Sequence, residues 1–156
     1  MSQTDFPIHE AISSGELSEL KKAVEQHSKI IDSPNDKGFP PVILASYSGR
    51  GDMTEYLLNQ GASVDVRDVA GNTALMGVSF KGYPAIAKLL IDKGALVNAQ
   101  NKQGNTALIF AAMFGQKEIV QLLLSQGADA KAKDGQGLTA ADYAKMKGQD
   151  KVLQIL

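Results

Sequence analysis

Two hydrophobic patterns alternate along the chain. The stretches Pro84 to Lys93 and Lys117 to Gln126 carry apolar residues at positions 86, 89 and 90 and at 119, 120, 122 and 123, a spacing typical of amphipathic helices. Each follows a shorter stretch rich in alanine and other apolar residues, Ala74 to Lys81 and Ala107 to Phe114. The pattern therefore predicts pairs of helices, with a short first helix and a longer second one.

The pairs repeat with a fixed period. Glycines recur every 33 residues in three series, which are Gly38, Gly71, Gly104 and Gly137; Gly49, Gly82, Gly115 and Gly148; and Gly61, Gly94 and Gly127. Such a period indicates a structural unit that has been copied. In one copy, Gly71 supplies the positive φ of a tight turn, and Gly82 ends the first helix in the left-handed conformation.

Threonines and the chain ends define the limits of the copies. Thr73, Thr106 and Thr139 precede the first helices, where a hydroxyl can accept a hydrogen bond from the new helix. A 33-residue unit cannot enclose a core alone, so the whole chain, 1–156, is predicted to be one domain. Its predicted parts are an N-terminal cap repeat (1–34), three internal repeats (35–67, 68–100 and 101–133) and a truncated C-terminal cap repeat (134–156). The second helix of the last part is expected to have about seven residues, since only a short stretch follows Gly148.

Composition limits the classes of partner and the location. The content is 44% hydrophobic and 21% charged, which is ordinary for a soluble globular protein. A net charge of −1 gives no reason to expect nucleic acid or an anionic membrane as partner. The N-terminus MSQTDFPIHE has no cationic stretch followed by an apolar core, so no signal peptide is expected. We therefore expect a cytoplasmic monomer.

Residues that could carry catalysis or hold a metal are few. The chain has no cysteine, and its two histidines, His9 and His27, both lie in the predicted N-terminal cap. No HExxH, phosphate-binding loop or G-x-S-x-G motif occurs. We therefore expect no catalytic residue, no metal site and no cofactor, and the chain is not predicted to be an enzyme.

The repeated residues resemble a known family. The pattern G-x-T-A-L…A-x-x-x-G…(I/V)-x-x-L-L-x-x-x-G-A-x-x-N is similar to the ankyrin repeat from about Asp5 to Leu156. The resemblance implies an all-α repeat solenoid of helix-turn-helix units with β-hairpin or loop fingers, about five repeats including the two caps. It also implies an L-shaped array, in which the fingers project from the helix pairs.

Two departures from the family pattern bear on function. The family histidine of the first helix is kept only as His9, so its hydrogen bond to the neighbouring loop is expected only there. Gly77 lies inside a predicted first helix, at a cost of about 1 kcal/mol relative to alanine. It is explained either by packing or drift, or by space left for a partner.

The resemblance also implies a binding face. Ankyrin proteins bind partners through the finger tips and the exposed side of the first helices. The matching tip residues are Asp36, Lys37, Phe39, Val69, Asn72, Lys102, Gln103 and Asn105. The matching helix residues are Tyr47, Phe80, Lys81, Met113, Phe114 and Met146.

One register of these positions forms a stripe of large apolar residues, namely Tyr47, Phe80, Met113 and Met146. The stripe either packs against the fingers or remains an exposed patch of the kind that marks binding surfaces. Lysines at positions 37, 81, 102 and 147 would give it a basic rim and favour an acidic or mixed-charge protein surface. The predicted function is non-enzymatic recognition of an unidentified protein partner, as a regulator or inhibitor. The alternative is a carrier of a small molecule or peptide in the same groove.

Overall fold

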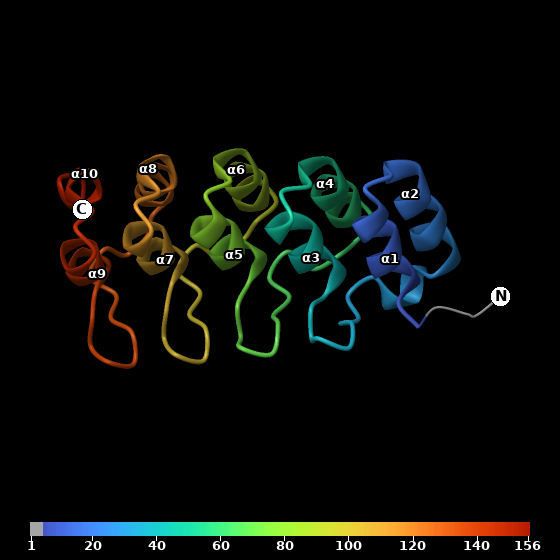
Figure 1. The fold of residues 1–156 in the computed structure, drawn as a ribbon, viewed down its shortest axis with the longest axis horizontal. Coiled ribbons are helices and arrows are strands. Elements are labelled where there is room, and N and C mark those ends of the chain that lie inside the picture. Colours follow the sequence, from blue (N-terminus) through green and yellow to red (C-terminus); the bar gives the residue numbers. More distant parts are fainter. Residues whose placement is uncertain (1–4) are drawn as a thin grey trace.

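The computed structural model describes residues 5–156, so the first four residues of the predicted N-terminal cap lie outside the described residues. Five helix pairs stand side by side in one row (Figure 1). The pairs, with one short 3₁₀ helix after the first, are α1 (Pro7–Ser14) and α2 (Leu17–Gln26), η1 (Ser28–Ile30), α3 (Pro41–Tyr47) and α4 (Gly51–Asn59), α5 (Ala74–Lys81) and α6 (Pro84–Asp92), α7 (Ala107–Met113) and α8 (Lys117–Ser125), and α9 (Ala140–Met146) and α10 (Asp150–Leu153). The predicted all-α repeat solenoid is confirmed.

The odd-numbered helices form one layer and the even-numbered helices a second (Figure 1). Each odd helix packs against the next odd helix and against the even helix of its own pair. Loops project from the odd layer on the side away from the even layer, so the fingers and the odd helices share one surface (Figure 1).

The predicted threonine caps begin three of the odd helices. The Oγ1 atoms of Thr73, Thr106 and Thr139 accept from the backbone N–H three residues on, at 3.4, 3.2 and 3.2 Å. At α5 the helix ends at Lys81, and Gly82 follows in the left-handed conformation with φ 85°. The expected bounds of this helix are therefore confirmed at both ends.

The core is a continuous seam between the two layers. Leu57, Leu90 and Leu123 on the even helices are all 0% exposed, and Leu75 and Leu108 on the odd helices are each 1% exposed. The sequence had pointed equally to Leu89 and Leu122, but these are only half-buried. In α6 and α8 the residue that faces the seam is thus the one in register with Leu57, namely Leu90 and Leu123.

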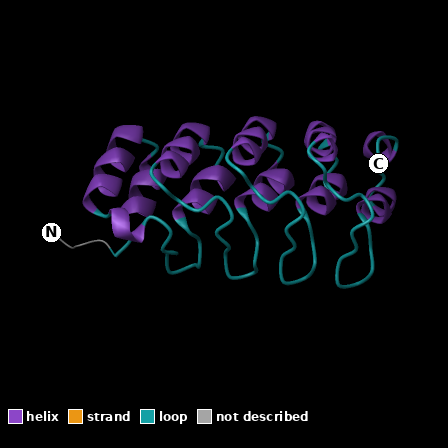
Figure 2. Cartoon of the chain, turned by 180° about the vertical axis from the view of Figure 1, so that it is seen from behind, coloured by secondary structure: helices purple, strands orange, loops and turns teal. Residues whose placement is uncertain are grey.

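The fingers are loops. No strand occurs among residues 5–156, so the hairpin form of the expected fingers is wrong (Figure 2). Each finger closes instead around one side chain at its start. In finger 68–72 the Asp68 Oδ1 atom accepts from the N–H groups of Ala70 and Asn72, at 3.0 and 2.9 Å. Fingers 35–39, 101–105 and 134–138 repeat this arrangement around Asn35, Asn101 and Asp134.

Neighbouring fingers are joined at two of their three junctions. The N–H of Lys102 donates to the Ala70 carbonyl at 3.1 Å, and the N–H of Gly135 donates to the Gln103 carbonyl at 2.8 Å. Side chains reinforce both junctions. Arg67 donates to the carbonyls of Gly71 and Gln100, both at 2.8 Å. Gln100 does the same one repeat later, to Gly104 and Lys133.

The junction between fingers 35–39 and 68–72 is different. Within residues 5–156, neither a backbone bond nor a side-chain bridge of this kind joins these two fingers. The position that matches Arg67 in the preceding repeat is Pro34, which has no donor to offer. This junction is therefore the least connected of the three.

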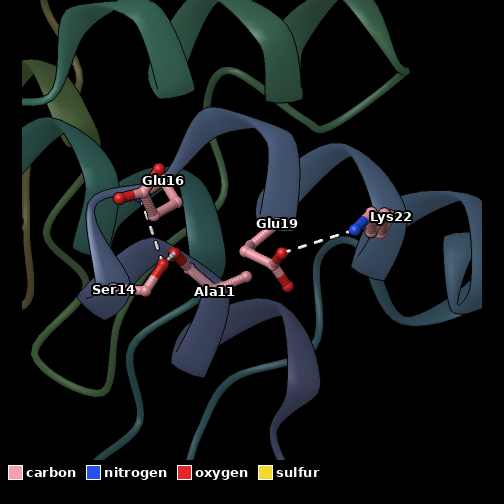
Figure 3. A network of polar contacts seen from close by, with 5 residues as sticks. All are labelled: Ala11, Ser14, Glu16, Glu19 and Lys22. Carbon is pink, nitrogen blue, oxygen red and sulfur yellow. Dashed lines mark hydrogen bonds and ion pairs between the residues drawn. The ribbon is translucent and has the colours of Figure 1, made fainter.

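The two ends of the row carry polar groups. At the N-terminal cap, the Ser14 hydroxyl donates to the Ala11 carbonyl and accepts from the N–H of Glu16, at 2.6 and 3.1 Å (Figure 3). Lys22 and Glu19 form an exposed ion pair at 3.5 Å (Figure 3). At the other end α10 has four residues rather than about seven, and it buries Val152.

Candidate protein-binding face

We use the term concave face for the surface formed by the odd helices and the fingers. Its finger tips expose Val69, which is 66% exposed, together with polar residues. The other exposed tip residues from the predicted set are Asp36, Lys37, Lys102 and Gln103. Asn105 differs from this expectation, since it is only 8% exposed. It directly precedes Thr106, the buried N-cap of α7, and so lies at the base of its finger rather than at the tip.

Three aromatic rings form a ladder across the concave face. Tyr47 at the end of α3 stacks on Phe80 of α5, with ring centroids 6.2 Å apart and an interplanar angle of 16°. Phe80 then meets Phe114 edge to face, with centroids 4.6 Å apart. The three side chains are nevertheless 42%, 37% and 44% exposed. The rings therefore pack on one another and still present apolar surface to a partner.

The stripe of Tyr47, Phe80, Met113 and Met146 is not evenly exposed. Met113 is half-buried against the core, and Phe114, the next residue, packs against Phe80 instead. Met146 is 64% exposed at the far end of the face, beyond the aromatic ladder.

A groove of about 360 Å³ opens on the concave face between α3, α5 and the fingers that precede them. Its lining includes the predicted residues Phe39, Tyr47 and Asn72. Its other lining residues are Ile43, Leu44, Asp68, Thr73 and Gly77, and of these the sequence had pointed only to Gly77 as a place where space could be left for a partner.

The groove exists where one repeat lacks a side chain. The positions matching Gly77 in the other repeats with the 33-residue register are Leu44, Phe110 and Tyr143, all large. A Cβ added to Gly77 would lie 3.3 Å from Cδ2 of Tyr47. Gly77 therefore lets the Tyr47 ring lie close against α5 and leaves the space in front of the helix open. The register 44, 77, 110 and 143 was the signal from which this feature could have been found.

Two carboxylates on the concave face, those of Asp68 and Asp134, accept several hydrogen bonds each. Besides its two backbone donors, Asp68 accepts from the side-chain amide of Asn72 at 3.3 Å. Asp134 accepts from the Tyr143 hydroxyl as well as from two backbone N–H groups. The hydroxyl of Tyr143 holds the pKa of Asp134 below its ordinary value, and the same bond raises the pKa of Tyr143.

Within residues 5–156, the lysines on this face form no ion pairs with carboxylates. The ion pairs formed within residues 5–156 join Lys22 to Glu19 and Lys88 to Asp92, both away from the concave face. The Lys81 ammonium lies 5.1 Å from the centroid of the Tyr47 ring. The lysines at 37, 81, 102 and 147 form no ion pair in the described part of the chain, so their ammonium groups are available to carboxylates of a partner.

One histidine contacts the backbone of Phe39, a residue that lines the groove. His9 is 8% exposed, and its Nε2 atom lies 2.6 Å from the carbonyl oxygen of Phe39, as the family resemblance implied. Burial lowers the pKa of His9, while the Phe39 carbonyl and the Asp36 carboxylate act in the opposite direction. A neutral His9 therefore holds finger 35–39 against α1.

Features of other protein classes were also sought among residues 5–156. No group of three or more His, Cys, Asp or Glu side chains lies together in a way that could hold a metal ion. None of the helices in this range has the length and apolar character needed to cross a lipid bilayer.

Fold and face together define a class of protein, a stacked array of helical repeats with an exposed recognition surface. The family model described as "Ankyrin repeats (3 copies)" matches residues 75–156, and the one described as "Ankyrin repeat" matches residues 37–69. The chain therefore belongs to the ankyrin repeat family, whose repeats are typical of protein–protein interaction modules.

A curated relative shares part of this array. The human DNA-binding protein RFXANK is 34% identical to the chain over 55 residues, which is 35% of this chain and 21% of the relative. The match thus spans about a fifth of the length of the relative, and it concerns a stretch of repeats rather than the whole protein.

Proposed function

We propose that this protein is a non-enzymatic module that binds a partner protein through its concave face and finger tips, and so acts as a regulator or inhibitor. The aromatic ladder of Tyr47, Phe80 and Phe114 carries the proposal. Exposed apolar patches of this kind mark interaction sites, and aromatic residues are enriched where binding energy is concentrated.

Rigidity supports the same function. The rings of Tyr47 and Phe80 are already stacked in the free protein, and the Asp68 and Asn101 networks hold the fingers. A surface that is formed before docking loses little conformational entropy on binding. The module needs no rearrangement to present its apolar patch.

A protein partner is proposed rather than a nucleic acid. The relative RFXANK is named a DNA-binding protein, but the match covers 21% of it. Binding to DNA depends on neutralising many phosphates with basic side chains. Here four free lysines are spread over the face, and the net charge is −1. The cytoplasmic location and the monomeric state stay predictions.

The proposal is tested by comparing capture of partners with two double variants. Phe80→Ser/Phe114→Ser removes the ladder, while Leu96→Ser/Leu153→Ser removes two exposed leucines outside the odd helices and fingers, which are 59% and 37% exposed. Proteins retained from a native lysate are quantified by mass spectrometry, and the affinity of each purified candidate is then measured for both variants.

The expected result is a partner whose affinity falls at least about tenfold with the ladder variant and is unchanged with the control. Circular dichroism of both variants confirms that they are folded. Equal affinity for the two double variants would contradict the proposal and move the search to the even helices.

The groove beside Gly77 favours a second candidate function, the binding of a small molecule. Its volume of about 360 Å³ lies within the range of small-ligand sites, about 300–1,000 Å³. A carrier of a small molecule would be stabilised by its ligand, since a ligand at 100 times its Kd adds about 2.7 kcal/mol. A melting-temperature screen of a fragment library tests this, with Gly77→Leu as the variant in which any shift should vanish.

A further inference from the structure

We infer that the groove beside Gly77 is an anchor site, which takes one large apolar side chain from a segment of the partner protein that carries carboxylates next to that side chain. The inference rests on the proposed function and specifies the chemistry of the partner. It follows from the space in the groove, from its lining, and from the charges beside it.

The space comes from Gly77 and is suited to one side chain. In the same register, Leu44 and Phe110 fill the corresponding position on the neighbouring helices with their own side chains. At Gly77 that volume is left open and is bounded by Phe39, Leu44 and the Tyr47 ring. A leucine or phenylalanine of a partner would therefore occupy the position that the other repeats fill themselves.

The polar groups of the lining favour an apolar occupant. The Asp68 carboxylate accepts three hydrogen bonds from its own finger. The Asn72 amide donates to Asp68 and accepts from the Asn101 side chain at 2.8 Å. The Thr73 hydroxyl accepts from the N–H of Met76. Because these groups already have partners, a polar occupant would lose hydrogen bonds to water and gain few in return.

Charges beside the groove favour carboxylates next to the anchor. Lys81 lies on α5, with its ammonium over the ring of Tyr47, which lines the groove. Lys37 lies on finger 35–39, two residues before the lining residue Phe39. Neither forms an ion pair within residues 5–156, while the Asp68 carboxylate, although charged, already accepts three hydrogen bonds and the exposed Asp36 lies next to Lys37. The Lys81 ammonium is therefore the main partner for an Asp or Glu that flanks the anchor.

The groove lies where two fingers meet without hydrogen bonds. Fingers 35–39 and 68–72 lack the backbone bond and the side-chain bridge that join the later fingers. The Val69 side chain packs against Gly38 instead, so an apolar contact joins the two fingers beside the groove.

A random peptide library displayed on phage provides the test, with the full chain as bait. Enriched peptides are synthesised, and their affinities are measured for the parent and for three variants. Gly77→Leu fills the groove, Lys81→Glu reverses its charge, and Phe80→Ser/Phe114→Ser removes the ladder. Gly77→Leu is expected to fold, because Leu44 occupies the same register in the preceding repeat; its melting curve checks this.

The expected result is a set of peptides that share one large apolar residue with Asp or Glu beside it. Their affinity should fall at least about tenfold with Gly77→Leu. A smaller loss of affinity is expected with Lys81→Glu. Because Lys81 is exposed, this variant should fold, and it tests the anchor site even if Gly77→Leu does not fold.

Three other results would overturn the inference and can be told apart. Peptides that lose affinity with the ladder variant, but keep it with Gly77→Leu and Lys81→Glu, would refute the anchor site and leave the proposed function standing. Two further outcomes would count against both the anchor site and the concave face as a binding surface. One is failure to enrich any peptide, and the other is an affinity of all three variants equal to that of the parent.

Discussion

The buried seam and the concave face of this array follow opposite rules. Along the seam, matching positions hold similar residues, as in Val42, Leu75 and Leu108, which are 0%, 1% and 1% exposed. On the concave face, the matching positions Leu44, Gly77, Phe110 and Tyr143 differ widely. Every seam residue must fit the same neighbours in each copy, whereas a surface residue need not. The surface positions at which the repeats differ are therefore the best candidates for contacts with a partner.

The largest expected effect is on the seam. Leu123→Ala should lower the free energy of unfolding by about 2–5 kcal/mol, because it removes a side chain that is 0% exposed and leaves a cavity. The matched change Leu122→Ala, on the half-buried neighbour, should cost clearly less. Urea unfolding followed by circular dichroism measures both. Equal costs would show that Leu123 is not the leucine of α8 that fills the seam.

A smaller loss of stability is expected when the N-cap of α7 is removed. Thr106→Ala removes the hydroxyl that accepts from the N–H of Ile109 in a buried setting. Loss of such a cap typically costs about 0.5–2 kcal/mol. Thr106→Ser keeps the hydroxyl and should recover most of the stability in the same unfolding assay. An alanine variant as stable as the parent would contradict the role given to this cap.

Gly77→Ala should act in the other direction. Alanine favours a helix over glycine by about 1 kcal/mol. Its Cβ would press on the Tyr47 ring at 3.3 Å, but that ring is 42% exposed and has room to yield. We expect a small rise in melting temperature, measured by calorimetry. A fall would show that the Tyr47 ring is fixed against α5 and that the groove is rigid.

The smallest effect concerns His9 and depends on pH. Burial holds its pKa in the folded protein below the ordinary value of 6.5, so the unfolded chain takes up the proton first. The stability that the neutral ring contributes is complete above pH 6.5 and is lost as the pH falls toward the folded value. His9→Gln should flatten this part of the stability profile. Urea unfolding at a series of pH values measures the profile, and an unchanged profile in His9→Gln would contradict this role of His9.

The sequence predicted the local structure well, because the signals are local. Thr73 and Gly82 bracket α5 at the expected residues, since a cap hydroxyl and a left-handed glycine each act within one helical turn. The leucine faces were less well predicted. Leu89 and Leu90 both fall on the apolar side of one helix, and only the way that α6 meets its neighbours decides which of the two is buried.

The site was predicted in outline. The tips and the exposed positions of the odd helices were expected from the family resemblance, and most of these residues lie on the surface. Phe114 was among the predicted residues, but its edge-to-face contact with Phe80 was not predicted, because that contact depends on how neighbouring repeats pack. Space for a partner was one of the two explanations given for Gly77, but the groove itself was not predicted, since a cavity depends on neighbours such as Tyr47 and Asn72 that are distant in the sequence.

The missing link between fingers 35–39 and 68–72 also has a mechanical consequence. In a one-dimensional stack, each unit is held only by its neighbours, so the array yields first at its weakest coupling. Under tension applied to the two ends, fingers 35–39 and 68–72 should therefore separate before the later pairs of fingers, which are joined by backbone hydrogen bonds. A partner side chain bound beside Gly77 would contact both of these fingers and should raise the force needed to separate them.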